Sequence, residues 1–277
     1  MNNFTSETKY ILNDIDLKKG DTVMLVSDIS SLLISFKKKE KVFDANLFID
    51  NILEKIGTDG TLLVPTYNYD FCKGHTFDYK NTPSMTGSLG KIALKRKDFK
   101  RTTNPIHSFA VYGKDKNLLC NLKHSSSFGD DSPFNYLHKK KSKYFSVGLN
   151  FTNLGFTPAH YVEEKVGVSY RYFKIFSGNY IDEFENKKKV EYKFYVRNLS
   201  RAAGTGIKKE TSKLLSEIKA YSEHLIKNEL FGIVYLDKAL DFLIYDMKNN
   251  SEKSRLIYPI EKNKKITRNK INFTEFV

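Results

Sequence analysis

The 277-residue sequence contains no tryptophan and only two cysteines, Cys72 and Cys120. Neither cysteine belongs to a CxxC or Cys/His cluster, so we do not expect a metal site built on them. Two cysteines far apart in the chain suit a reducing compartment. We therefore expect a protein without a metal cofactor.

Long apolar runs are also missing. No stretch approaches the roughly 18 apolar residues of a membrane-spanning helix, and the first ten residues lack the basic start and apolar stretch of a signal peptide. These absences predict a soluble, cytoplasmic protein that has no membrane partner. The 40% hydrophobic content is enough for a packed core. We expect one domain over residues 1–277, with a weakly structured tail from about residue 249.

Acidic residues are too few to balance the basic ones. Lys and Arg number 46 and Asp and Glu 32, which gives a formal net charge of +14. A basic protein often binds an anionic partner. No nucleic-acid-reading motif is present, so we expect no nucleic-acid partner, although a basic nucleic-acid-binding protein remains an alternative. The charge also fits phosphate-bearing ligands such as CoA, or lysines spread over solvated faces.

The apolar pattern predicts alternating strands and helices. Residues 21–27 and 61–64 are typical of buried strands, and residues 43–56 between them have helical spacing. Strand, loop, helix and strand in this order begin an α/β layered fold. Further strands are predicted at 108–112, 144–147, 170–176, 190–196 and 231–236, and further helices at 84–97, 134–137, 158–165, 207–227 and 240–247.

Two histidines are candidates for chemistry. In the predicted helix 158–165, His160 and Glu163 lie at positions i and i+3, on one face. A carboxylate beside a neutral imidazole makes a good general base near pH 7. The same pair also suits a surface ion pair, and the second histidine of a helical zinc site is missing. His107, before a predicted strand, can equally be a packed core residue.

Small polar residues follow two of the predicted elements. Ser30 and Ser31 form a polar loop after the first strand, and Ser84 is the predicted N-cap of a helix that includes Gly87. Hydroxyls and free backbone N–H groups at such places suit phosphate binding. Neither segment is a GxxxxGK[ST] or GxGxxG loop, and ordinary capping is the alternative.

Taken in order, these segments resemble the aminoglycoside 3-N-acetyltransferase family. No single element is specific, but the ordered set is, and the resemblance covers roughly residues 18–180. It rests on Ser30-Ser31-Leu32, on GTLLVPTY at 60–67, on TPSMTG at 82–87, on the stretch from Arg101 to HSFA at 107–110, and on HYVE at 160–163.

The resemblance implies a fold, a donor and a set of site residues. The fold is a three-layer α/β/α arrangement around a central mixed sheet, unrelated to the GNAT acetyltransferases, with extra C-terminal strands and helices. Acetyl-CoA is the donor and transfer to an amine is direct, with His160 as base and Glu163 beside it. The implied cofactor-binding residues are Ser30, Ser31, Ser84, Gly87 and Ser108, and the implied substrate-binding residues are Tyr67, Asp70 and Arg171.

The expected acceptor is a nucleotide-linked amino sugar. Residues 67–74 and 160–164, with Arg171 and Lys174 after them, are similar to the family branch found with surface-polysaccharide genes. That branch acts on sugars such as a dTDP-3-amino-3,6-dideoxyhexose of the lipopolysaccharide O-antigen. Asn104-Pro105 stands where antibiotic-modifying members often have His-Pro, and a +14 chain is a poor host for a polycation unless it carries a local acidic patch.

Several alternatives remain open at this point. The first is an aminoglycoside antibiotic 3-N-acetyltransferase, the second is the basic nucleic-acid-binding protein named above, and the third is a CoA-binding protein without catalysis. Transfer through an acetylated Cys72 or Cys120 is the rival mechanism. A homo-oligomer is possible, and the sequence does not name the sugar, the amino position or the nucleotide.

Overall fold

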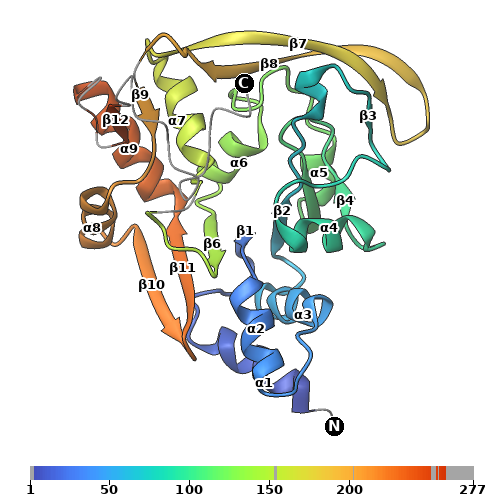
Figure 1. Ribbon diagram of the computed structural model, residues 1–277, viewed down its shortest axis with the longest axis vertical. Helices are drawn as coiled ribbons and strands as arrows, with labels where there is room; N and C mark the ends of the chain where they lie inside the picture. The colour runs from blue at the N-terminus through green and yellow to red at the C-terminus, as the bar shows by residue number, and fades with distance from the viewer. Residues whose placement is uncertain (1–2, 153–154, 202, 251–253, 255, 260–277) are drawn as a thin grey trace.

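The computed structural model describes residues 3–152, 155–201, 203–250, 254 and 256–259 (Figure 1). Within them, the centre of the molecule is a seven-stranded mixed sheet with the strand order β10-β11-β6-β1-β2-β5-β4. Strand β1 (Thr22–Ser27) pairs in parallel with β2 (Thr61–Pro65) on one side and β6 (Lys143–Val147) on the other. Antiparallel strands flank this parallel group: β5 (Phe109–Gly113) and the edge strand β4 (Lys100–Arg101) beyond β2, and β11 (Glu229–Tyr235) and the edge strand β10 (Tyr221–Ile226) beyond β6.

Successive side chains of the central strands enter two different hydrophobic cores. Met24 and Leu63 belong to one core, whereas Val23 and Leu62 belong to the other. This alternation follows from the two-residue repeat of a strand, and it requires a helical layer on each face. Full burial of each such apolar side chain contributes about 1.5–3 kcal/mol.

The two helical layers divide the chain between them. The core of Val23 also takes residues of α1 (Asn3–Asn13), α2 (Ser30–Lys38), α3 (Ala45–Ile56) and α4 (Gly87–Lys95). The core of Met24 takes residues of α5 (Lys116–Cys120), α6 (Pro133–Lys139), α7 (Pro158–Val166), α8 (Lys209–Glu217) and α9 (Leu236–Asn250). The predicted three-layer fold around a mixed sheet is confirmed.

A long hairpin arches over one end of the molecule (Figure 1). It consists of β7 (Arg171–Ile181) and β8 (Lys187–Arg197), and β3 (Phe77–Asp78) adds a third strand after the short helix η1 (Asp70–Lys73). The chain then forms β9 (Ala203–Thr205), which pairs antiparallel with β12 (Ile257–Pro259) near the end of the described chain.

Three local predictions were wrong. The helix predicted over 207–227 ends at Glu217, because Lys219 adopts a left-handed conformation (φ 55°) and residues 221–226 pair with β11 as β10. Ser30 and Ser31 are not a loop but the first residues of α2. Ser84 is not an N-cap, since α4 begins only at Gly87, whose φ of +67° needs a glycine.

The other predicted strands and helices are found within a few residues of their expected ends. Of the predicted weak tail, residues 257–259 form β12, and residues 251–253, 255 and 260–277 lie outside the described residues. The single domain over residues 1–277 stays a prediction. In the described part of the chain, no helix has the length and apolarity that crossing a bilayer requires.

Candidate active site

Several of the predicted site residues follow the carboxyl ends of the three parallel strands. Ser30 follows β1, Tyr67 and Gly87 follow β2, and α7 with His160 follows β6. Because β6, β1 and β2 are neighbours and parallel, their carboxyl ends lie at one edge of the sheet. Ligands of open α/β sheets bind at this edge. His107 reaches it too, since it precedes the antiparallel β5.

His160 and Glu163 form a close pair on α7. Pro158 starts the helix, and the i, i+3 spacing brings His160 Nδ1 to 2.6 Å from Glu163 Oε2. The Glu163 side chain is fully buried, whereas 23% of the His160 side chain is exposed. A carboxylate can only accept a hydrogen bond, so Nδ1 carries a hydrogen and donates a hydrogen bond to Glu163. This tautomer leaves Nε2 as the basic nitrogen of His160.

Three further groups hold the Glu163 carboxylate. Arg171 Nε lies 2.7 Å from the same oxygen, Oε2. The other oxygen, Oε1, accepts a hydrogen bond from the Tyr170 hydroxyl at 2.8 Å and a second from the Thr205 hydroxyl. With His160, three hydrogen-bond donors and the charge of Arg171 surround the carboxylate. Glu163 is therefore fixed in position and orientation.

The charges of the pair follow from these contacts. Burial alone would raise the pKa of Glu163, but the Arg171 guanidinium and the hydrogen bond from His160 lower it to about 2. Burial and then the nearby Arg171 charge lower the pKa of His160 below its usual 6.5, and Glu163 offsets part of this decrease. At neutral pH the pair is thus a carboxylate and a neutral imidazole.

His107 lies in the same region but is enclosed by aromatic rings. Its ring centroid is 4.9 Å from those of Tyr67 and Phe128, and Phe128 in turn packs 5.8 Å from His160. Its Nδ1 is 2.9 Å from the Ser127 hydroxyl, and burial lowers its pKa well below 6.5. This geometry fits a neutral, packed histidine that forms part of the wall behind His160.

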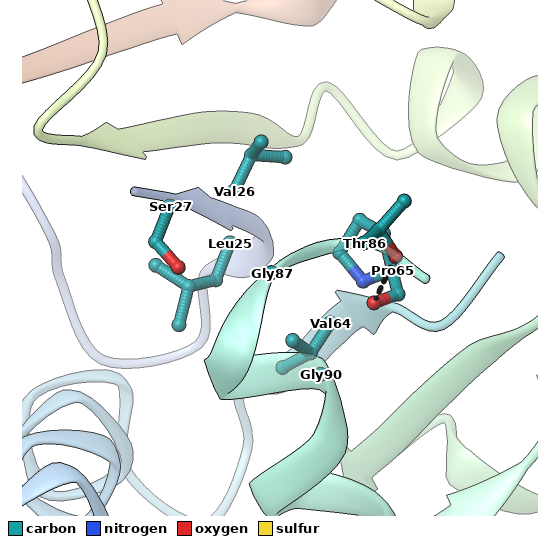
Figure 2. Close-up of a pocket in the computed structure, with 8 residues that line it drawn as sticks. All are labelled: Leu25, Val26, Ser27, Val64, Pro65, Thr86, Gly87 and Gly90. Atoms are coloured by element: carbon teal, nitrogen blue, oxygen red, sulfur yellow. Dashed lines mark hydrogen bonds between the residues drawn. The ribbon is translucent and has the colours of Figure 1, made fainter. Parts of the chain in front are cut away.

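A small cavity opens between the ends of β1 and β2 and the start of α4 (Figure 2). Its volume is about 110 Å³. Thr86 leaves the α4 N–H groups uncapped, because its hydroxyl donates to the Pro65 carbonyl at 2.9 Å. A Cβ at Gly87 would lie 3.0 Å from the Ser27 carbonyl oxygen, and one at Gly90 would lie 2.5 Å from that of Pro65. Only glycines keep this space open.

The size of the cavity indicates how much of a CoA thioester this edge of the sheet can hold. Typical small-molecule pockets measure about 300–1,000 Å³, so a space of about 110 Å³ accepts one part of a long ligand such as CoA. The free N–H groups at the start of α4 favour an oxygen-rich group there. The residues that line the cavity are Leu25, Val26, Ser27, Val64, Pro65, Thr86, Gly87 and Gly90.

The predicted cofactor residues differ in their surroundings. Gly87 lines the cavity. Ser84 is buried behind it, and its hydroxyl accepts a hydrogen bond from the backbone N–H of Thr86. The Ser31 hydroxyl donates to Glu229 at 2.5 Å. Contacts of Ser84 and Ser31 with a cofactor stay predictions.

The two remaining serines are similarly untested. Ser108 is fully buried at the start of β5, where its hydroxyl accepts from Arg101 Nε and donates to the Thr66 carbonyl. Ser30 begins α2, with its N–H bonded to Asp28. The position of Ser108 suits the support of strand β5, and a direct contact with CoA stays a prediction for both.

The predicted substrate residues do not converge on one point. The Tyr67 hydroxyl is buried beside Thr157, without a hydrogen bond of ordinary geometry in the described chain. Asp70 is 43% exposed in η1 and lies 3.5 Å from Lys73. The Arg171 side chain is only 8% exposed and bonds to Glu163 and the Tyr195 carbonyl. This favours a role for Arg171 in holding Glu163, and its contact with substrate stays a prediction.

An acidic cluster beside α7 was missed by the sequence reasoning. The Ser126 hydroxyl donates to the Glu164 carboxylate, and its oxygen lies 2.6 and 2.8 Å from the two carboxylate oxygens. Burial, followed by the charges of Asp130 and Asp131, raises the pKa of Glu164. The loop of Ser126 also carries Phe128, which packs on His160. No pattern in the sequence links this loop to α7, so the cluster appears only in the folded chain.

The described residues include no group of three or more His, Cys, Asp or Glu side chains placed to bind a metal ion. Cys72 and Cys120 are free thiols, and burial raises the pKa of each to about 12. Such thiols are protonated at neutral pH and are poor nucleophiles.

Comparison with known proteins gives a consistent picture. Residues 34–245 match the model of the family described as aminoglycoside 3-N-acetyltransferase. A relative from Bacillus subtilis (strain 168), the SPbeta prophage-derived aminoglycoside N(3')-acetyltransferase-like protein YokD, is 24% identical over 164 residues. That alignment covers 50% of this chain and 58% of the relative, so the chain matches little more than half of the relative's length.

Solved structures share the fold. The aminoglycoside acetyltransferase AAC(3)-Xa superposes with a TM-score of 0.72 at 17% identity, over 89% of this chain and 93% of that one. The crystal structure of Bacillus subtilis YokD gives 0.69 at 19%, over 89% and 99%. The binary complex of AAC-IIIb with CoASH gives 0.71 at 13%, over 88% and 96%. With a family model that matches more than half of its residues, the chain belongs to the aminoglycoside 3-N-acetyltransferase family.

Proposed function

We propose that this protein transfers an acetyl group from acetyl-CoA to an amino group of an amino sugar, with His160 as the general base. One observation carries the proposal: Glu163 accepts a hydrogen bond from Nδ1–H of a neutral, partly exposed His160, which leaves Nε2 basic. Family membership supports the reaction class, and the CoASH complex of a protein with the same fold supports the donor.

The reaction needs one proton transfer and one exchange of bonds. His160 Nε2 takes a proton from the amine, directly or through one water, as the nitrogen attacks the thioester carbonyl. The C–N bond forms, the C–S bond breaks, and the leaving CoA thiolate takes up a proton. Glu163 stabilises the imidazolium that forms on His160 in between. The protonated thiols of Cys72 and Cys120 support direct transfer over an acetyl-enzyme.

The donor thioester belongs at the sheet edge in this proposal. The glycine-lined cavity between β1, β2 and α4 would take one part of CoA, and Gly87 and Gly90 would let it approach the backbone closely. Tyr67, His107 and Phe128 form a continuous row of rings from the end of β2 to His160. The acceptor amine would approach from the exposed side of His160.

The acceptor best supported is a cationic aminoglycoside. A chain of net charge +14 needs a local acidic patch to bind such a molecule. Glu164, Asp130 and Asp131, on α7 and on the loop that packs against His160, would supply it, and Lys165 already pairs with Asp130 at 2.8 Å. The names of the family and of the similar structures point the same way.

A nucleotide-linked amino sugar is the second candidate, favoured by the overall basic charge. Its diphosphate would need free cations, and exposed lysines are present on the hairpin at Lys174 and Lys187 to Lys189. Arg171 was expected to serve as well, but its guanidinium is bonded within the protein. This reduces the support for a diphosphate next to His160.

A thioester-release assay over a panel of amines tests the proposal. We expect CoA release with gentamicin-like aminoglycosides, at a kcat/KM well above that with dTDP- or UDP-linked amino sugars. A higher kcat/KM with the nucleotide-linked amino sugars would make them the favoured acceptor in place of the aminoglycosides. CoA binding without turnover on any amine would make the chain a CoA-binding protein. Salt-dependent retention on nucleic acid without thioester consumption would favour the nucleic-acid alternative.

A further inference from the structure

The segment that follows the hairpin sends one side chain back into the active site. Thr205, in strand β9, lies 42 residues after Glu163 in the sequence, yet its hydroxyl donates a hydrogen bond to Glu163 Oε1. The same hydroxyl accepts from Arg171 Nη2 at 3.3 Å. Thr205 therefore bridges the carboxylate and the guanidinium that flank His160.

The C-terminal segment in turn holds Thr205. Strand β12 pairs antiparallel with β9, with Ile257 opposite Thr205. The backbone N–H of Gly206 donates to the Leu256 carbonyl at 2.9 Å, and Leu256 is fully buried in the same core as Val162 of α7. Backbone pairing next to a packed side chain therefore ties β12 to β9.

A second contact ties this segment to the helical layer. The Ser254 hydroxyl donates at 2.7 Å to Asp246, a buried carboxylate on α9. Helix α9 packs along α7, which carries His160 and Glu163. The C-terminal segment is thus connected to α7 in two ways. It contacts α9, which packs on α7, and through β12 and β9 it holds Thr205, which bonds to Glu163 on α7.

We propose that Thr205 is a positioning residue for His160, acting through Glu163, and that strand β12 keeps it in place. The inference rests on the proposed role of His160 as base. Glu163 Oε1 is held by Tyr170 and Thr205, and this leaves Oε2 for Arg171 and His160. Without Thr205, Oε1 keeps only the Tyr170 hydroxyl, so the carboxylate is held less firmly as the acceptor for Nδ1 of His160.

Loss of that acceptor changes which nitrogen carries the proton. The tautomer of a neutral histidine is set by the hydrogen bond that one ring nitrogen makes. With Glu163 fixed, Nδ1 is protonated and Nε2 is basic. With Glu163 held less firmly, the second tautomer becomes populated as well, and only the tautomer with a basic Nε2 can take the proton of an amine.

The test compares Thr205→Val with Thr205→Ser in the full-length protein. Valine keeps the shape but removes both hydrogen bonds, whereas serine keeps the hydroxyl. We expect T205V to lower kcat about tenfold, the equivalent of one hydrogen bond to a charged group, with little change in KM for acetyl-CoA. We expect T205S to restore most of kcat.

A second measurement separates this proposal from the proposed function. The ¹⁵N chemical shifts of the His160 ring report its tautomer without any turnover. The wild-type and T205S proteins should show one tautomer, protonated at Nδ1, and T205V should show a mixture. This readout works even if no amine tested is acetylated.

Thr61→Val serves as the control for stability. Thr61 is also a buried threonine, and its hydroxyl accepts a hydrogen bond from the Asp115 N–H at 3.1 Å, at the start of β2 and away from the site. T61V should lower the melting temperature but leave kcat and the His160 tautomer unchanged. The proposal is overturned if T205V keeps a single Nδ1-protonated tautomer, or if T61V alters kcat and tautomer as much as T205V does.

Discussion

The guanidinium of Arg171 lies 3.1 Å from Nδ1 of His160, although protonation would make the imidazole a cation as well. Because Nδ1 already donates to Glu163, this contact is not a hydrogen bond but a close approach of a fixed positive charge. Together with burial it disfavours the imidazolium and lowers the pKa of His160. The arrangement keeps the base unprotonated at neutral pH.

The first prediction concerns the pH profile of kcat/KM. In the free enzyme His160 must be neutral to act as the base, and its pKa lies below 6.5. Activity should therefore be constant on the acidic side of neutrality and fall only below pH 6.5, as His160 takes up a proton. Measuring kcat/KM for acetyl-CoA between pH 5 and 8 checks this. An acidic limb centred above pH 6.5 would contradict the lowered pKa.

The second prediction concerns His160→Ala. Loss of the base should reduce kcat by about 100- to 10,000-fold, while CoA binding stays close to wild type because the cavity lies at α4. Thioester release and calorimetric titration with CoA measure the two effects. His75→Ala is the matched control, since His75 is exposed and outside the pair. Near-normal turnover in H160A would remove His160 from the mechanism.

The third prediction concerns stability and pH. The pKa of Glu163 falls from 4.5 to about 2 on folding. A lowered carboxyl pKa means that the unfolded chain binds more protons, so this contribution is present above pH 4.5 and is lost as pH falls towards 2. At about 1.4 kcal/mol per pKa unit it amounts to about 3 kcal/mol.

Glu163→Gln tests that contribution. The variant leaves the buried Arg171 charge without its carboxylate, so we expect it to be less stable by about 3 kcal/mol at pH 7. Denaturant unfolding between pH 2 and 7 should also show a weaker loss of stability with acid than in the wild type. Glu210→Gln, at an exposed position in α8, is the control and should behave as wild type in both respects.

The fourth prediction concerns the cavity. Gly87→Ala places a methyl group 3.0 Å from the Ser27 carbonyl and strains a backbone with φ +67°. We expect KM for acetyl-CoA to rise about tenfold, the equivalent of about 1.4 kcal/mol. Gly20→Ala has similar backbone strain (φ +87°) but open space around its Cβ, away from the cavity. Equal KM values in the two variants would show that strain alone, and not the cavity, is responsible.

The fifth prediction concerns the acidic cluster. Glu164→Gln should raise KM for an aminoglycoside about fivefold at low salt, the equivalent of about 1 kcal/mol. Salt screens such a contact, so the difference from wild type should shrink at high ionic strength. KM for acetyl-CoA should stay unchanged. If E164Q lowers KM for a nucleotide-linked amino sugar and does not raise KM for the aminoglycoside, the nucleotide-linked sugar becomes the better supported acceptor.

Sequence pattern alone determined the layered fold and the pair on α7. Strands of buried apolar residues and the i, i+3 spacing of His160 and Glu163 are local features, and local geometry follows from the backbone repeat. The pattern failed at 207–227, where residues 221–226 are a strand only because β11 pairs with them. The pairing partner of residues 221–226 comes from a later segment, so the spacing of apolar residues within 207–227 does not reveal it.

Tertiary structure alone decided what surrounds Glu163 and where the charges lie. Tyr170 just before β7, Arg171 in β7 and Thr205 in β9 all reach one carboxylate. The charges of Asp130 and Asp131 act on Glu164 only because their loop folds onto α7. Arg171, expected from its charge to face a substrate, is bonded within the protein. Hydrogen bonds and electrostatic interactions depend on distances between atoms, and distances between segments far apart in the chain are set only when the two cores pack against the sheet.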